Sequence, residues 1–138
     1  MRLLRINKRK QKQIYIDLQT SVDCWVSPTF TADIYVGLKP GYEGKIPKFA
    51  YEIVEKSCKS YCNAIGLAVT LEETHFIYKY GSEPGVKVGL INYPRYPKTA
   101  DDILKHALAL AKNLKDALEQ YRVSVVTSDM TYMIGDID

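Results

Sequence analysis

The chain has few cysteines and no long apolar run. Its cysteines, Cys24, Cys58 and Cys62, are an odd number in 138 residues, which does not fit a disulfide framework. No apolar stretch approaches the roughly 18 residues of a membrane span, and no apolar signal-peptide core follows Met1. These absences predict a reducing compartment, the cytoplasm.

The signatures of common catalytic and cofactor sites are also missing. There is no Gly-rich phosphate loop, no zinc-protease helix motif and no nucleophile elbow. Cys58 and Cys62 share a helical face, but a zinc site needs two further ligands, and no matched pair supplies them. We therefore expect no metal and no cofactor, with both cysteines packed as small apolar side chains.

What is present is an ordinary globular composition with an uneven distribution of charge. Hydrophobic residues make up 46% of the chain and charged residues 25%, which predicts a folded domain. Without the basic residues that precede residue 13, acidic residues outnumber basic ones. We predict a basic N-terminal arm over residues 1–12 and a single domain over 13–138. The basic residues of the arm are Arg2, Arg5, Lys8, Arg9, Lys10 and Lys12.

Alternation of apolar and polar residues predicts the strands. The alternation is clearest from Phe30 to Leu38, where every second residue from Phe30 onward is apolar. Further strands are expected at 14–18, 67–80, 86–90, 122–127 and 131–134.

Two helices are expected between these strands. The first lies between Pro47, which suits a first turn, and Gly66, which suits a helix end. The second begins after Thr99, a good N-cap, and carries one long apolar stripe.

The resulting order predicts an α+β fold, a ferredoxin-like split βαβ sandwich (βαββαβ) with an extra N-terminal strand and a short C-terminal strand. Two helices can cover only one face of this sheet. The other face would carry Tyr35, with Tyr78 or Ile77 and with Ile91 or Leu90. Because an apolar sheet face is usually covered, we predict a homo-oligomer, most simply a dimer.

The segment Ile34-Tyr35-Val36-Gly37-Leu38 resembles the first signature strand of RRM domains, in which an aromatic side chain stacks on a base. The second signature departs from the pattern, because Tyr93 alone among residues 87–93 is aromatic. The resemblance implies base stacking on Tyr35. Since the basic arm can neutralise phosphates, the alternative function is a nucleic-acid-binding module that uses the arm and the open sheet face. A strand that contains one tyrosine is the simpler interpretation.

The segment from residue 92 to 97 is the main candidate for ligand binding. Two prolines stiffen it, and aromatic side chains with an arginine are the types that anchor interfaces and stack planar ligands. We predict a ligand site made by Asn92, Tyr93, Arg95 and Tyr96, together with Tyr35. The competing interpretation is a rigid connector between a strand and a helix.

A third possibility is an acid–base site. The apolar positions of the 67–80 strand change parity across Glu72, Glu73 and Thr74, for which we predict a bulge or a bend. Glu73 and His75 would then serve a small hydrolase or isomerase. Adjacent glutamates on a strand point to opposite faces, so Glu72 and Glu73 are not a carboxylate pair.

These observations together favour a non-enzymatic, homo-oligomeric binding protein without a catalytic set. Its expected action is to sequester a small, nucleotide-like ligand or to block a host protein. In overall character, though not in any motif, the chain resembles small phage-encoded proteins, some of which bind host signalling nucleotides or block host defence proteins. That resemblance implies an anti-defence role and, for a viral protein, the host cytoplasm.

Overall fold

The chain forms two separate β-sheets and two helices. The computed structural model describes residues 2–7, 12–17, 22–41 and 44–136. Strands β1, β2 and β3 form one sheet, and the other five strands form a sheet in the order β5-β6-β4-β7-β8. The elements are β1 (Arg2–Asn7), β2 (Lys12–Asp17), β3 (Val22–Val26), β4 (Thr31–Gly37), α1 (Ala50–Ile65), β5 (Val69–Tyr78), β6 (Gly81–Ile91), α2 (Ala100–Ala117), β7 (Arg122–Thr127) and β8 (Thr131–Gly135).

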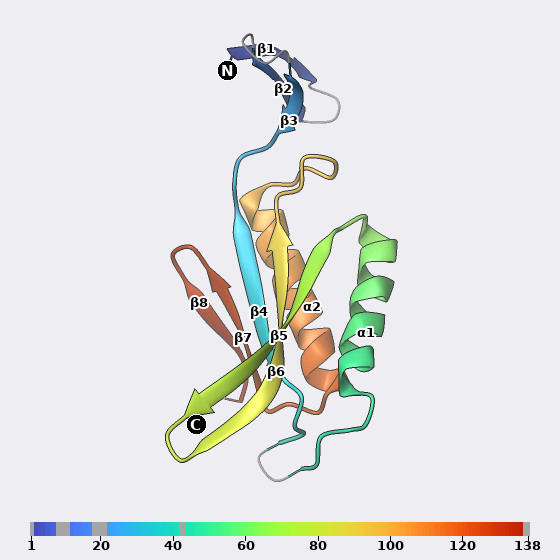
Figure 1. Cartoon of the computed structure of the whole chain (residues 1–138), viewed down its shortest axis with the longest axis vertical. Helices are drawn as coiled ribbons and strands as arrows, with labels where there is room; N and C mark the ends of the chain where they lie inside the picture. The colour runs from blue at the N-terminus through green and yellow to red at the C-terminus, as the bar shows by residue number, and fades with distance from the viewer. Residues whose placement is uncertain (1, 8–11, 18–21, 42–43, 137–138) are drawn as a thin grey trace.

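Both helices lie on the same face of the five-stranded sheet, which leaves its other face without a helical layer (Figure 1). All neighbouring strands are antiparallel. β6 inserts between β4 and β5, the two strands that α1 connects, which is the split βαβ arrangement. The predicted α+β ferredoxin-like fold is confirmed, and β8 is the expected short C-terminal strand.

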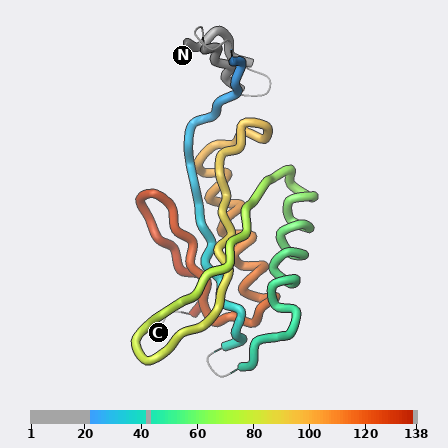
Figure 2. The backbone as a smooth tube through the Cα atoms, viewed as in Figure 1, coloured from blue at the N-terminus to red at the C-terminus, as the bar shows by residue number. Residues whose placement is uncertain are grey.

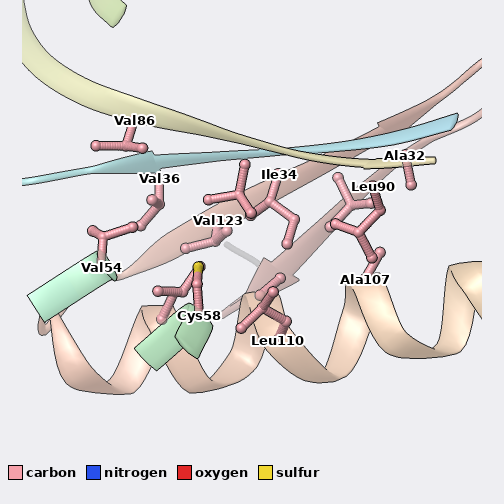
Figure 3. Packing of buried hydrophobic residues seen from close by; sticks show 14 of the residues in the cluster. Ala32, Ile34, Val36, Val54, Cys58, Val86, Leu90, Ala107, Leu110 and Val123 are labelled. Carbon is pink, nitrogen blue, oxygen red and sulfur yellow. The ribbon is translucent and has the colours of Figure 1, made fainter. Parts of the chain in front are cut away.

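The core lies between the sheet and the helices. Ala32, Ile34 and Val36 alternate along β4 and are fully buried, because side chains of a strand alternate between its faces. They pack against α2, whose Ala107 and Leu110 are also fully buried (Figure 3). Burying each large aliphatic side chain contributes about 1.5–3 kcal/mol to folding, so this layer holds the sheet to the helices.

The ends of the helices follow the predicted capping residues. The Thr99 side chain accepts a hydrogen bond of 3.2 Å from the Asp102 backbone N–H, which satisfies one free donor at the start of α2. Gly66 ends α1 in the left-handed region, with φ at 72°, and its N–H bonds the carbonyl of Cys62.

The N-terminal strand is the main departure from the expected arrangement. The strand expected at 14–18 is β2, which pairs with β1 and β3 and not with the five-stranded sheet. Short connections let three consecutive strands pair with one another, so this region forms its own meander. Arg2 and Arg5 belong to β1 and Lys12 to β2, whereas Lys8, Arg9 and Lys10 lie outside the described residues.

The β5–β6 hairpin extends past the part of the sheet that the helices cover (Figures 1 and 2). The predicted bulge is wrong, because β5 pairs with β6 in unbroken register from Val69 to Tyr78. The change of apolar parity has another cause. Leu71 faces the helices opposite the buried Val88, whereas Phe76 lies on the open face, where it meets the ring of Tyr35.

Within the part of the chain that the structure describes, no helix combines the length and the apolar character needed to cross a membrane.

Candidate functional site

The open face of the five-stranded sheet carries a row of polar and aromatic side chains. Because β4 buries every second residue, Asp33 and Tyr35 point away from the core. Their cross-strand neighbours on β6 are Gly89 and Lys87. We call the set Asp33, Tyr35, Phe76 and Lys87 the open-face strip.

A charged pair occupies one end of this strip. Lys87 Nζ lies 3.8 Å from Asp33 Oδ2, and each side chain is about one-third exposed, 31% and 30%. At this exposure the pair contributes little to stability. It does place ammonium donors and carboxylate acceptors side by side, where both can still reach a ligand.

Two glycines of β6 open space on the same face. A Cβ on Gly89 would lie 2.6 Å from Thr70 Oγ1 and 3.3 Å from Asp33 Oδ1. A Cβ on Gly85 would collide with the Phe76 ring and lie 2.8 Å from the carbonyl oxygen of Val36. The absence of side chains at these positions lets the neighbouring groups lie close to the strand.

An aromatic pair follows the charged pair along the strip. The ring centroids of Tyr35 and Phe76 are 6.4 Å apart at an interplanar angle of 64°, an edge-to-face arrangement. Because the faces of aromatic rings carry negative charge, such a pair suits a planar or cationic group.

The open face ends in a pocket of about 260 Å³. It lies where β6, the segment after β4 and the start of β7 meet. We call it the end pocket, and its lining residues are Gly41, Tyr78, Glu83, Gln120, Tyr121 and Arg122.

Two acceptor atoms converge at the edge of this pocket. Gln120 is 9% exposed, and its Nε2 donates to the carbonyls of Lys39 (2.8 Å) and Leu118 (3.1 Å). These bonds orient the amide so that Oε1 faces Gly37. A Cβ on Gly37 would lie 2.8 Å from both Gln120 Oε1 and Glu83 Oε1, so both oxygens border the same small space.

The end pocket also contains both signs of charge. Arg122 Nε donates to the carbonyl of Asp136 at 3.2 Å, which fixes the guanidinium side chain at the pocket. No described residue forms an ion pair with the Glu83 carboxylate. The pocket therefore presents a carboxylate, an amide oxygen and a guanidinium between tyrosine rings.

The predicted ligand residue Asn92 is engaged by backbone. Its Nδ2 donates to the carbonyl of Pro28 at 2.8 Å, and its Oδ1 accepts from the Lys98 N–H at 2.9 Å. Ser27 Oγ donates to the Asn92 carbonyl at 2.6 Å. These contacts tie the 92–98 segment to the chain before β4, as a rigid connector would.

The other predicted residues of this segment gather beside it. The rings of Tyr93 and Tyr96 lie 6.3 Å apart, and the Arg95 guanidinium carbon lies 5.9 Å from the Tyr96 ring centre. Tyr35 is not with them. The segment follows Ile91, which pairs with Thr31 at the start of β4, and Tyr35 is four residues further along that strand. A ligand role for Asn92, Tyr93, Arg95 and Tyr96 stays a prediction.

The candidate acid–base residues lie on two faces. Glu72 lies opposite Lys87 in the strand register, on the open face, whereas Glu73 and His75 point to the opposite side of β5. His75 is exposed near the end of the hairpin. On the open face this cluster therefore contributes only Glu72, and it forms no acid–base pair there.

The helical layer contains a separate cluster of titratable groups. Burial raises the pKa of the Cys58 thiol to about 12, with a further contribution from Cys62, so Cys58 is an inert apolar side chain. Tyr61 Oη lies 2.9 Å from His106 Nδ1. Burial, followed by the charge of Lys98, lowers the pKa of His106. Among the described residues no group of His, Cys, Asp and Glu is placed to hold a metal ion.

Sequence reasoning missed Asp33, Lys87, Glu83 and Gln120. Asp33 was visible as a polar position between buried residues of the strongest strand, but its partner depended on the register between β4 and β6. The recurrent glycines of β6 were a further signal, because glycine inside a strand often marks a close approach.

No family model matches this sequence, and no curated protein does. Two solved structures share the fold. A phage SAM lyase in complex with S-methyl-5'-thioadenosine has a TM-score of 0.65 at 18% identity, over 80% of this chain and 92% of that chain. A phage SAM lyase in the apo state has a TM-score of 0.65 at 20% identity, over 78% of this chain and 89% of that chain. At this identity the likeness establishes a shared fold.

The expectation of a non-enzymatic binding protein is wrong, because the solved proteins that share this fold are lyases. Among the three interpretations the small enzyme is the nearest class. The expected nucleotide-like ligand agrees in kind with S-methyl-5'-thioadenosine, which is a nucleoside, and the resemblance to phage proteins agrees with the source of both structures.

Proposed function

We propose that this protein is a lyase that cleaves S-adenosylmethionine (SAM) and releases S-methyl-5'-thioadenosine. The observation that carries the proposal is the match to phage SAM lyases over about nine-tenths of their length, 92% and 89%. The open-face strip supports it independently, since an aromatic pair beside the Asp33 carboxylate suits a cationic nucleoside.

Comparison of the proposed substrate, SAM, with the proposed product, S-methyl-5'-thioadenosine, identifies the bond that breaks. The sulfonium of SAM carries a methyl group, a 5'-deoxyadenosyl group and an amino acid chain, and S-methyl-5'-thioadenosine retains the first two. The bond between sulfur and the γ-carbon of the amino acid chain therefore breaks, and its electron pair stays on sulfur as a neutral thioether. The substrate's own carboxylate oxygen bonds to the γ-carbon, which gives homoserine lactone and balances atoms and charge.

For this reaction the protein has to position the substrate, and a catalytic base is not needed. The nucleophile and the leaving group belong to one molecule, so rate is gained by holding the carboxylate in line with the breaking bond. An edge-to-face aromatic pair, Tyr35 and Phe76, can accept the sulfonium face on. We assign the ribose hydroxyls to Asp33 and Lys87, whose charges offer both acceptors and donors at 3.8 Å separation.

The proposal includes a second copy of the chain over the open face. Tyr78, Ile91 and Met133 on that face are 53%, 45% and 64% exposed. Covering them removes apolar surface from water. It also excludes water from the reacting bond, which protects a lyase from becoming a hydrolase.

The proposal places the protein in the host cytoplasm as a phage anti-defence protein. SAM is the methyl donor of methyltransferases, so its destruction deprives host modification and defence enzymes that depend on it.

The test is product analysis by liquid chromatography and mass spectrometry. Purified protein incubated with SAM should release S-methyl-5'-thioadenosine and homoserine lactone in equal amounts. S-adenosylhomocysteine is the control, because its neutral sulfur is a poor leaving group and should remain intact. Release of S-methyl-5'-thioadenosine at the rate of the buffer alone would refute the proposal.

A further inference from the structure

We infer that the end pocket binds the α-amino acid group of the substrate, with Glu83 and Gln120 accepting from its ammonium. The inference rests on the proposed function and adds to it a specificity subsite. It assigns the recognition of the amino acid chain to a part of the open face distinct from the open-face strip.

The first argument is the convergence of acceptors. Glu83 Oε1 and Gln120 Oε1 each lie 2.8 Å from one point, the Cβ position that Gly37 lacks. No ligand atom can occupy that point, which is a bond length from the Gly37 Cα, but two acceptors on the same side of Gly37 can be reached together by a group with several N–H donors and a positive charge. An ammonium has three donors and no acceptor.

The second argument is the rigidity of one of these acceptors, the Gln120 amide oxygen. The Gln120 amide is nine-tenths buried, and both its donated bonds go to backbone carbonyls, so its oxygen cannot exchange places with its nitrogen. Fixed acceptors bind an ammonium without the cost of ordering side chains.

The third argument is charge complementarity over the whole group. A zwitterionic amino acid presents an ammonium and a carboxylate on one carbon. The end pocket places the Arg122 guanidinium beside Glu83 and Gln120, and so offers a positive charge to the carboxylate. A volume of about 260 Å³ accommodates such a group.

The fourth argument is the distance to the open-face strip. Gly37 lies four residues from Asp33 on β4, which is about 13 Å along an extended strand. Tyr35 lies midway. A substrate that lies along β4 with its ammonium beside Gly37 would therefore place its sulfonium near the Tyr35–Phe76 pair and its ribose near Asp33.

The test compares two ligands that differ in the amino acid chain. S-adenosylhomocysteine and S-methyl-5'-thioadenosine both carry an uncharged thioether on adenosine, but S-adenosylhomocysteine alone has the amino acid group. We expect Glu83→Gln to weaken S-adenosylhomocysteine binding about ten- to hundredfold in calorimetry, the usual effect of losing a charge-assisted hydrogen bond. S-methyl-5'-thioadenosine should bind the variant as it binds the parent, which also shows that the variant is folded.

Glu73→Gln is the matched control. It removes the same charge from the same hairpin but on the opposite face of β5, so both ligands should keep their affinities. Asp33→Asn should weaken both ligands by the same factor, because it acts on the shared ribose.

The outcomes separate the two proposals. Equal weakening of both ligands by Glu83→Gln, or no weakening of either, would overturn the end-pocket assignment while SAM cleavage stands. Failure of the parent protein to bind S-adenosylhomocysteine more tightly than S-methyl-5'-thioadenosine would also overturn the end-pocket assignment, whereas failure to cleave SAM would overturn both proposals.

Discussion

Gly85 and Gly89 occupy similar positions on the open face of β6, but their surroundings differ. The Cβ position of Gly85 meets a ring, Phe76, and a backbone oxygen, that of Val36 at 2.8 Å. The Cβ position of Gly89 meets side-chain oxygens of Thr70 and Asp33. Side-chain ends can rotate away, whereas a backbone oxygen in a sheet cannot move without breaking the ladder.

We therefore expect Gly85→Ala to lower the free energy of unfolding by about 1–3 kcal/mol, the usual cost of overpacking. Gly89→Ala should cost less. Urea denaturation followed by circular dichroism measures both. Equal stability of the two variants would show that the backbone contact of Gly85 does not limit the packing.

His106 makes the stability of the protein depend on pH. Burial and the charge of Lys98 lower its pKa below the ordinary 6.5, with a smaller contribution from Lys105 and an opposing one from Asp102. Between the lowered and the ordinary value the unfolded chain binds a proton that the folded chain does not. Stability is thus full above about pH 6.5 and declines as the pH falls towards the folded-state value.

The expected result is a lower urea midpoint at about pH 5.5 than at about pH 7.5. His106→Gln should reduce this difference, since glutamine does not titrate in this range. A pH dependence identical in the variant and the parent would assign the effect to other groups.

The class of reaction and the residues of the site were the features that the sequence predicted least well. The absence of a catalytic motif predicts a binding protein, but a lyase of the proposed kind, whose nucleophile belongs to its substrate, needs no such motif. The site candidates Glu83 and Gln120 are 37 residues apart in sequence numbering and meet only because both border Gly37. No local sequence pattern predicts that two residues so far apart in the chain lie close together.

Local signals were more reliable at the scale of elements. The capping role of Thr99 and the stop at Gly66 followed from residue type alone, because both act within one turn of their helices. The bulge at Glu72–Thr74 was wrong for the opposite reason. Which face of β5 is buried depends on how far the helices reach along the sheet, and this is a tertiary property.

The start of α2 provides a quantitative test of the capping argument. Thr99→Ala removes the side-chain acceptor 3.2 Å from the Asp102 N–H, and should lower the free energy of unfolding by about 1 kcal/mol. Thr99→Ser keeps the hydroxyl and is the control, with a stability close to that of the parent. If alanine proved as stable as serine in urea denaturation, the cap would not contribute.

At the scale of the whole molecule, the sequence predicted the order of elements, and the order determined the fold. Most core strands had an apolar alternation, although that of β5 changed parity, and the connections left few ferredoxin-like arrangements. The separate N-terminal sheet was not predicted, because the pairing of β1, β2 and β3 with one another depends on which strands compete for the edges of the larger sheet. Strand patterns identify strands but not their neighbours.

The open face leads to the final prediction, which concerns assembly. One side of the sheet carries both helices, and the other carries the open-face strip together with exposed apolar residues such as Met133, at 64%. We expect the protein to be a homo-oligomer, most simply a dimer, in light scattering coupled to size-exclusion chromatography. Met133→Lys introduces a charge into the proposed apolar contact and should shift the elution towards the monomer.

Loss of assembly should also reduce catalysis. If a second copy shields the reacting bond from water, SAM cleavage per chain should fall on dilution below the dissociation constant, and Met133→Lys should fall similarly without dilution. Glu73→Gln, which alters the other face of β5, should retain both the assembly and the activity of the parent. A parent protein that is monomeric at all concentrations and fully active would contradict the proposed covering of the open face, because its site would then work while exposed to water.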